Sequence, residues 1–200
     1  MFKVTILIVL AYLLGSIPNA LWIGKIFKNI DIRKYGSGNL GSTNAARVLG
    51  WKLGILTLIL DVLKGSVFVI IAKRMNLDDI HLILIGMAAI LGHSYTIYLG
   101  FKGGKAVATS LGVFIILIPK VILFLLIIFF IIVFITQYIS LASITCAFLL
   151  PILTYILYNN IMYTIFGLII GIIIIIRHKP NIINLINRKE AKFFDKVDKK

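Results

Sequence analysis

Long runs of apolar residues alternate with short polar segments along this 200-residue chain. About 20 apolar residues cross the hydrocarbon core of a bilayer as one helix, so each run predicts one membrane-spanning helix. The pattern predicts an all-α polytopic bundle of seven transmembrane helices, at residues 4–26, 53–72, 80–99, 106–118, 121–138, 141–157 and 161–176. The fourth run is short, so the helix tilts little, the bilayer thins there, or the helix extends back into Gly103 and Gly104.

Basic residues gather at alternate ends of these predicted spans. Counted with their flanks, the segments after the first, third, fifth and seventh spans hold 16 Lys and Arg residues, against four on the other side, with Lys64 inside a span. Lysine and arginine accumulate on the cytoplasmic side of membrane proteins. The distribution therefore predicts that the N-terminus lies outside and the C-terminus in the cytoplasm.

The composition supports a membrane protein and weakens other classes. Hydrophobic residues make up 60% of the chain and charged residues 14%, whereas a soluble domain is about 45 to 50% apolar and about 25% charged. The net charge of +14 is typical of nucleic-acid binding, but in a membrane protein it serves orientation and contact with anionic lipid. We expect one domain over 1–200 with a basic cytoplasmic tail over 181–200, no nucleic-acid partner and no cofactor. The single cysteine, Cys146, allows no internal disulfide and indicates no metal site.

The polar segment after the first predicted span is rich in Gly, Ser and Asn. Residues 36–41 match a dinucleotide fingerprint formally, but that fingerprint requires a strand before it, so we reject the match. Glycines let successive backbone N–H groups turn toward one anion, a Ser, Thr or Asn can cap a short helix ending at Gly50, and an arginine fork suits phosphate oxygens. The alternative is a flexible turn with an orienting arginine. We predict an anion site that comprises Gly36, Ser37, Gly38, Asn39, Thr43, Asn44 and Arg47, with Ser42, Thr43 or Asn44 as the helix cap.

A second basic segment precedes the fourth predicted span. Lys102 and Lys105 flank Gly103 and Gly104. If the helix begins there, the two lysines share one face beside its positive end and can meet a phosphate. The segment is not a Walker A loop, because Ala106 follows the lysine where Ser or Thr is needed. A lysine pair that only orients the protein remains the alternative.

Two further segments hold polar side chains at the ends of predicted spans. Ser140 can cap the sixth span, with Ser143 one turn later, although capping and a bond to the helix backbone would explain both. Pro180 ends the seventh span and leaves His178 at the boundary, where an imidazole can bind phosphate or act as a base. His93, near the inner end of the third span, is more typical of a packing residue.

Two charged residues lie inside the second predicted span. An isolated charge in the bilayer core costs about 2.5 to 3.5 kcal/mol on insertion scales. Asp61 and Lys64 are three residues apart and can neutralise each other on one helix face. We interpret them as a structural lock, with contact to a substrate as the alternative.

These segments, in this order, resemble the bacterial acyl-phosphate:glycerol-3-phosphate acyltransferases of the PlsY family. The resemblance spans almost the whole chain and rests on 14–18, 36–39, 43–44, Arg47, 61–65, 92–93, 101–105, 107–109, 140–141, Ser143, 177–178, 181–182 and Glu190. It implies a seven-helix enzyme of the bacterial cell membrane with its active site on the cytoplasmic side. Such an enzyme transfers a fatty acyl chain from acyl phosphate to the first hydroxyl of glycerol 3-phosphate and produces lysophosphatidic acid.

The resemblance also implies roles for individual residues. It makes Ser37, Lys105, Ser143 and His178 catalytic, and it gives substrate binding to Gly36, Gly38, Asn39, Thr43, Asn44, Arg47, Lys102, Gly103, Gly104, Ser140 and Asn181. The sequence departs from the family pattern at several positions: Leu40 and Thr96 stand where the family usually has Pro, Ala106 replaces Gly, Asn184 replaces Arg, and Gln137 replaces a basic residue. The loss of charge at Gln137 matters most, because phosphate is expected nearby.

The chemistry of an acyl phosphate favours direct transfer. This mixed anhydride has a good leaving group, so positioning and electrostatic stabilisation suffice without an acyl-enzyme. The base is the substrate's own phosphate or His178, because no Ser-His-Asp or Cys-His set is present.

A membrane transporter for a phosphorylated solute is the rival function. Transporters usually carry broken helices and internal repeats, whereas 121–135 has no polar interruption, so the rival rests on Asp61 and Lys64 alone.

Overall fold

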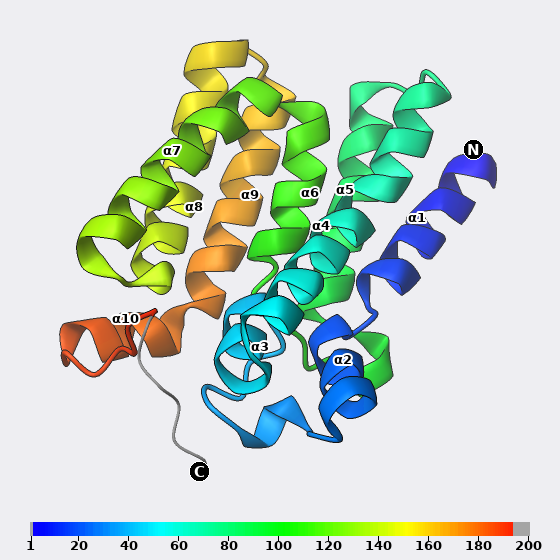
Figure 1. The fold of residues 1–200 in the computed structure, drawn as a ribbon. Coiled ribbons are helices and arrows are strands. Elements are labelled where there is room, and N and C mark those ends of the chain that lie inside the picture. Colours follow the sequence, from blue (N-terminus) through cyan, green and yellow to red (C-terminus); the bar gives the residue numbers. More distant parts are fainter. Residues whose placement is uncertain (1, 194–200) are drawn as a thin grey trace. The chain divides into compact units, whose positions relative to one another are not determined.

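The computed structural model describes residues 2–193, and within this range every regular element is a helix (Figure 1), which confirms the all-α class. The chain divides into two compact units, which in the described part are residues 2–116 and residues 117–193. The helices of the first unit are α1 (Phe2–Gly15), α2 (Asn19–Lys28), η1 (Ile32–Lys34), α3 (Ser42–Leu49), α4 (Trp51–Arg74), α5 (Asp79–Ser94), η2 (Ile97–Leu99) and α6 (Val107–Leu117), whose last residue belongs to the second unit. The second unit holds α7 (Pro119–Thr136), α8 (Ile139–Tyr158), α9 (Ile161–Arg177) and α10 (Lys179–Ile186).

The first predicted span is not one continuous helix. It consists of α1 and α2, which meet at a bend of 43°. Pro18 has no N–H to continue the helical hydrogen bonds, so the helix breaks there. The carbonyls of Ser16 and Ile17 accept hydrogen bonds from the hydroxyl of Thr96 and the ammonium of Lys64. Backbone groups freed by a break inside a membrane need such partners, so the break depends on side chains from α4 and from the segment after α5.

Glycines allow the helices of the first unit to approach closely. A Cβ on Gly15 would run into the carbonyl of Ala89 in α5. A Cβ on Gly112 of α6 would likewise run into the carbonyl of Val62 in α4. Small residues at helix contacts are typical of membrane bundles, where association depends on close packing. The α1–α5 and α4–α6 pairs are therefore fixed by backbone contact.

The second unit is built from two antiparallel helix pairs, α7–α8 and α8–α9, followed by α10. Pro180 was expected to end the last helix. The helix α9 does end at Arg177, but Pro180 then lies in the first turn of α10, which is bent from α9 by 59°. A proline in a first turn costs no hydrogen bond. The predicted tail therefore begins with a helix, and its residues 194–200 lie outside the described part of the chain.

The lengths and surfaces of these helices fit a bilayer. Among residues 2–193, four helices are long and apolar enough to cross a membrane, or six if each bent pair forms one span; α6 is a shorter apolar helix. Large apolar side chains face outward, including Phe134, which is 88% exposed. Such surfaces suit lipid rather than water. The count of seven spans and the orientation of the termini stay predictions.

Candidate functional site

The first polar segment is attached to a hydrophobic cluster at one end of the first unit. The cluster contains Ala20, Leu21, Ile23, Ile32, Leu40, Ala45 and Leu49, with Leu99 among the half-buried residues packed on it. Leu40 and Leu99 lie in the segments that precede α3 and the lysine-containing loop respectively. The cluster therefore fixes both polar segments of this unit to one core.

The turn that opens the first segment is held by an ion pair. Asp31 accepts a hydrogen bond from the backbone N–H of Arg33 at 3.1 Å and two from its guanidinium at 2.9 and 2.6 Å. The side-chain hydrogen bond from Arg33 lowers the pKa of Asp31 from 3.8 to about 2. The carboxylate is therefore charged at any physiological pH, and Arg33 is committed to the turn η1.

Asn44 organises the loop that follows. Its side chain is buried, its Oδ1 accepts the N–H of Ser37 at 2.9 Å, and its Nδ2 donates to the carbonyl of Asn39 at 3.1 Å. Gly36 and Gly38 have left-handed backbones, with φ of 56° and 71°, as glycine permits at no steric cost. The short helix ending before Gly50 is confirmed, but the predicted cap is wrong. Gly41 occupies the N-cap position and no side chain caps α3, because Asn44 is engaged with the loop.

The backbone amides of this loop also differ from the predicted anion nest. The N–H of Ser37 bonds to Asn44, that of Gly38 to the carbonyl of Tyr35 at 2.9 Å, and that of Asn39 to the Ser37 hydroxyl at 3.4 Å. These amides therefore stabilise the loop itself. Anion binding here would draw on the exposed Ser37 side chain and on Arg47 of α3, with Thr43 one turn before that arginine on the same helix face.

The second polar segment, residues 102–105, is called the lysine loop below. Its Gly103 N–H donates to the carbonyl of Ser94 at 3.1 Å, and its Gly104 N–H donates to the carbonyl of His93 at 3.0 Å. The helix α6 begins only at Val107, so Lys102 and Lys105 do not share a helix face as predicted. The two lysines instead belong to a loop whose backbone is hydrogen-bonded to the end of α5.

Ala106 joins this loop to α6 in a left-handed conformation, with φ of 61°. A residue with a Cβ costs about 1 to 2 kcal/mol in that conformation. This is the position at which the resembled family usually has glycine. Ala106 therefore adopts a backbone conformation that favours glycine.

In the second unit, Glu190 brings the two remaining segments together. Its Oε1 accepts hydrogen bonds from the Ser140 hydroxyl and from the Asn181 amide, each at 2.7 Å. Ser140 was predicted to cap α8, but Tyr138 holds the N-cap position and no side chain caps this helix. Sequence reasoning gave Glu190 no role. Its signals in the sequence were its acidic charge within a basic segment and its place among the residues that carry the family resemblance.

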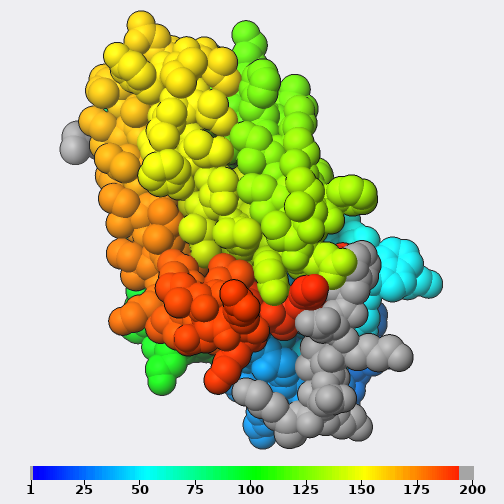
Figure 2. All heavy atoms as spheres, turned by 90° about the vertical axis from the view of Figure 1, so that its left-hand side faces the viewer, coloured from blue at the N-terminus to red at the C-terminus, as the bar shows by residue number. Residues whose placement is uncertain are grey.

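Figure 2 shows the orange-red atoms of the segment after α9 covering the end of the second unit at which α7 gives way to α8. The backbone supports this placement, since the N–H of Phe193 donates to the carbonyl of Gln137 at 2.8 Å. Gln137 itself is left-handed, with φ of 62°, and ends α7. The residue that departs from the family's basic pattern therefore anchors the chain through its backbone.

Ser143 lies on α8 and His178 lies at the turn between α9 and α10, and both are buried. The Ser143 hydroxyl donates to the carbonyl of Ile139 at 2.9 Å, which is the helix-backbone bond anticipated from the sequence. The Nδ1 of His178 lies 2.8 Å from the carbonyl of Ile174. A carbonyl oxygen only accepts, so Nδ1 carries the proton and Nε2 is the acceptor nitrogen of the neutral ring.

Removal of the Glu190 carboxylate tests this second cluster. Glu190→Ala leaves the Ser140 hydroxyl and the Asn181 amide without their acceptor. Hydrogen bonds to charged groups contribute about 1.5 to 3 kcal/mol each, so we expect a loss of about 2 kcal/mol or more, measured by thermal unfolding in detergent. Lys189→Ala, an exposed neighbour, serves as the control. Equal stability of the two variants would show that Glu190 does not hold the cluster.

The described residues contain no group of three or more His, Cys, Asp or Glu side chains that could hold a metal ion. The residues proposed for the site offer hydroxyls, amides, the His178 imidazole and cationic side chains. Such groups bind and orient anions.

Comparisons with known proteins agree on one family. The model of the glycerol-3-phosphate acyltransferase family matches residues 5–188. A glycerol-3-phosphate acyltransferase of Fusobacterium nucleatum is 50% identical over 186 residues, which cover 93% of this chain and 96% of that protein. One of Macrococcus caseolyticus is 48% identical, with 95% and 97% covered.

Two solved structures are also similar. A crystal structure of PlsY, described as an integral membrane glycerol 3-phosphate acyltransferase in its glycerol 3-phosphate form, superimposes with a TM-score of 0.90 at 40% identity and covers 95% of both chains. The lysophosphatidic acid form of PlsY gives a TM-score of 0.88 at 39% identity, with the same coverage.

Proposed function

Because this chain belongs to the glycerol-3-phosphate acyltransferase family, we propose that it transfers a fatty acyl chain from acyl phosphate to the sn-1 hydroxyl of glycerol 3-phosphate. The family match over residues 5–188 carries this proposal. The products are lysophosphatidic acid and inorganic phosphate. The proposal places the reaction in a bacterial cell membrane, with seven spans, an outer N-terminus and the active site on the cytoplasmic side.

The reaction needs no covalent intermediate on the protein. The hydroxyl oxygen of glycerol 3-phosphate attacks the acyl carbon, the bond from that carbon to the phosphate oxygen breaks, and phosphate leaves with the electron pair. The hydroxyl proton passes to a phosphate oxygen of the substrate or to Nε2 of His178. Phosphate is a good leaving group, so positioning and electrostatic stabilisation are the enzyme's main contributions.

In the first unit, we assign the acyl-phosphate group to the loop before α3 and the glycerol 3-phosphate to cationic side chains. The loop offers the exposed hydroxyl of Ser37 and the half-buried Asn39, on a backbone shaped by Gly36, Gly38 and Asn44. Arg47 and Lys105 supply the positive charge, supported by Lys102 and by Thr43. Gly103 and Gly104 bring the lysine loop close to α5, which supports a role in placing its charges.

In the second unit, the residues assigned to the substrate are Ser143, His178 and Asn181, with Ser140 beside them. Glu190 ties Ser140 to Asn181, and the helix backbone holds His178 in one tautomer. These bonds fix polar groups in advance, as electrostatic catalysis requires.

The lack of one sequence motif supports acyl phosphate as the donor. Enzymes that use acyl-CoA carry a His-x4-Asp motif, but Tyr98 stands five residues after His93, and Ile183 stands five after His178.

The rival transporter function rested on Asp61 and Lys64. Their partners are each other and atoms of the protein's own break in the first span, so the pair is explained without a transported solute.

The donor assignment has a direct test. Purified protein in a lipid phase, supplied with glycerol 3-phosphate, should form lysophosphatidic acid with palmitoyl phosphate and not with palmitoyl-CoA. The readout is transfer of radiolabelled glycerol 3-phosphate into the lipid fraction. Reaction with the thioester alone would overturn the donor, and reaction with neither donor would overturn the proposed function.

A further inference from the structure

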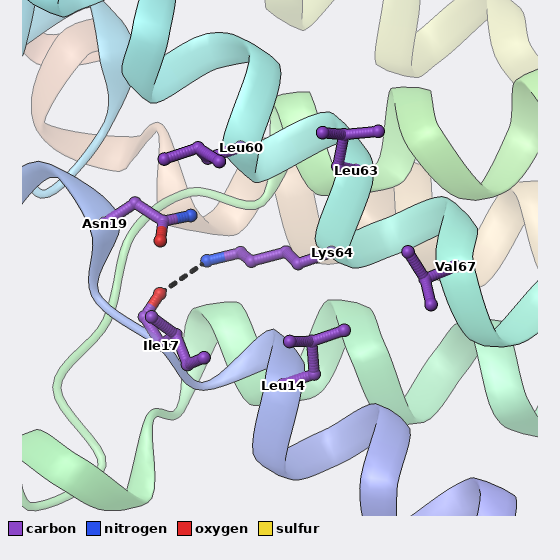
Figure 3. Close-up of a pocket in the computed structure, with 7 residues that line it drawn as sticks. All are labelled: Leu14, Ile17, Asn19, Leu60, Leu63, Lys64 and Val67. Carbon is purple, nitrogen blue, oxygen red and sulfur yellow. Dashed lines mark hydrogen bonds between the residues drawn. The ribbon is translucent and has the colours of Figure 1, made fainter.

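A buried cluster of charged and polar side chains lies where the first span breaks. The side chains of Asp61 and Lys64 are only 1% and 4% exposed and form an ion pair at 2.9 Å. Figure 3 shows Lys64 reaching from α4 toward the backbone of Ile17 and the amide of Asn19, past the apolar Leu14. The ammonium donates to the Ile17 carbonyl at 2.8 Å, and Nδ2 of Asn19 donates to Oδ1 of Asp61 at 2.9 Å. Side chains and backbone from α4 and the α1–α2 break therefore fix this one carboxylate oxygen.

His93 lies between this cluster and the lysine loop. Its buried ring has Nδ1 at 3.9 Å from Oδ1 of Asp61. The opposite edge of the ring, at Nε2, touches Gly104 so closely that a Cβ on that glycine would collide with it. The backbone carbonyl of His93 also accepts the Gly104 N–H at 3.0 Å. The ring therefore stands between a fixed carboxylate and the loop backbone.

We propose that His93 is a positioning residue whose ring sets where the lysine loop rests, and hence where the ammonium of Lys105 lies. This inference rests on the proposed function, in which Lys105 binds glycerol 3-phosphate. Lys105 directly follows Gly104, so a shift of the glycine moves the lysine with it. His93 acts only through the loop and does not touch the substrate.

The lysine loop is irregular and is attached to the end of α5 through its backbone. It lies between η2 and α6 with no regular structure of its own, and Lys102 is exposed. The N–H groups of Gly103 and Gly104 donate to carbonyls at the end of α5, and that of Lys102 donates to the carbonyl of Leu99 at 3.3 Å. The His93 ring, packed against Gly104, adds a rigid side-chain contact to these backbone hydrogen bonds.

The first test compares His93→Ala and His93→Gln with His81→Gln, a control on the same helix at its other end. Hydrogen exchange of the Gly103 and Gly104 amides reports directly on the position of the loop. We expect about tenfold faster exchange at these amides in His93→Ala, with partial recovery in His93→Gln, whose amide reaches the place of Nε2, and none of this change in His81→Gln. Unchanged exchange in a folded His93→Ala protein would overturn the proposal.

Steady-state kinetics distinguish a positioning role of His93 from a general loss of structure in the variant. We expect the KM for glycerol 3-phosphate to rise about tenfold or more in His93→Ala, with a smaller change in kcat and recovery in His93→Gln. Faster exchange with an unchanged KM would support the positioning role and overturn the proposed role of the loop in binding. A fall in kcat alone, with unchanged exchange, would overturn the positioning role.

Paired glycine variants provide a test that does not depend on His93→Ala being stable alone. The Cβ of Gly104→Ala would collide with the His93 ring, whereas that of Gly103→Ala would collide with the His93 backbone carbonyl. Removal of the ring can therefore relieve only the first collision. We expect Gly104→Ala/His93→Ala to bind glycerol 3-phosphate better than the sum of the single effects predicts, and Gly103→Ala/His93→Ala to show no such gain. Equal coupling in both pairs would overturn the proposal.

Discussion

Lys105→Ala is expected to lower acyl transfer by about 100- to 1000-fold, the scale on which removal of one preorganised charge-stabilising donor acts. The reason is that Lys105 carries a cationic head in a half-buried loop fixed to α5, where a neighbouring phosphate would gain more from the charge than it would in water. The measurement is kcat/KM with both substrates varied. Thermal unfolding should be unchanged, because the side chain is not part of the packed core.

Two further variants show whether the position of the charge matters. Lys52→Ala, an exposed lysine in the first turn of α4, should keep full activity. Lys105→Arg keeps the charge but replaces a compact ammonium with a planar fork, so we expect an intermediate rate. Near-normal turnover of Lys105→Ala would return the lysine loop to a purely orienting role.

The apolar runs identified most of the helices. A segment that crosses a bilayer needs a continuous apolar run of similar length and must satisfy its backbone hydrogen bonds within the segment. The bends were missed. Pro18 was included in a continuous span, and Pro180 was taken as a stop, whereas the structure places helices on both sides of each. A proline marks where a helix is interrupted, but whether a second helix follows depends on partners such as Lys64, which lie far away in the sequence.

The predicted helix caps were wrong for a similar reason. Ser140 and Asn44 have the side chains that favour a helix N-cap, yet Ser140 bonds to Glu190 and Asn44 bonds to its own loop. The preference of Ser and Asn for helix N-caps is lost where the side chain has another hydrogen-bond partner. The sequence does not reveal that Glu190 folds back, because nothing local sets the path of the segment after α9.

The pairing of Asp61 with Lys64 was predicted correctly, since a spacing of three places both on one helix face. The contact of His93 with Gly104 was not predictable in the same way. It depends on how closely the loop approaches α5, which is a result of glycine packing rather than of periodicity. The sequence therefore supplied the residue types of the proposed site, while the contacts that hold these residues in place were visible only in the structure.

Asp61→Asn is expected to destabilise the protein by about 3 to 5 kcal/mol, the cost of breaking a buried ion pair by removing one partner. The variant leaves the ammonium of Lys64 buried beside the break in the first span, with only the Ile17 carbonyl and a neutral amide near it. A double variant, Asp61→Asn/Lys64→Met, removes both charges and keeps a similar volume, so it should recover most of the loss. The comparison requires chemical unfolding in one detergent, with Asp78→Asn, at the exposed start of α5, as the control. If Asp61→Asn proves as stable as Asp78→Asn, the ion pair does not lock the break, and the hydrogen bonds of Lys64 to Ile17 and of Thr96 to Ser16 would hold it without the carboxylate.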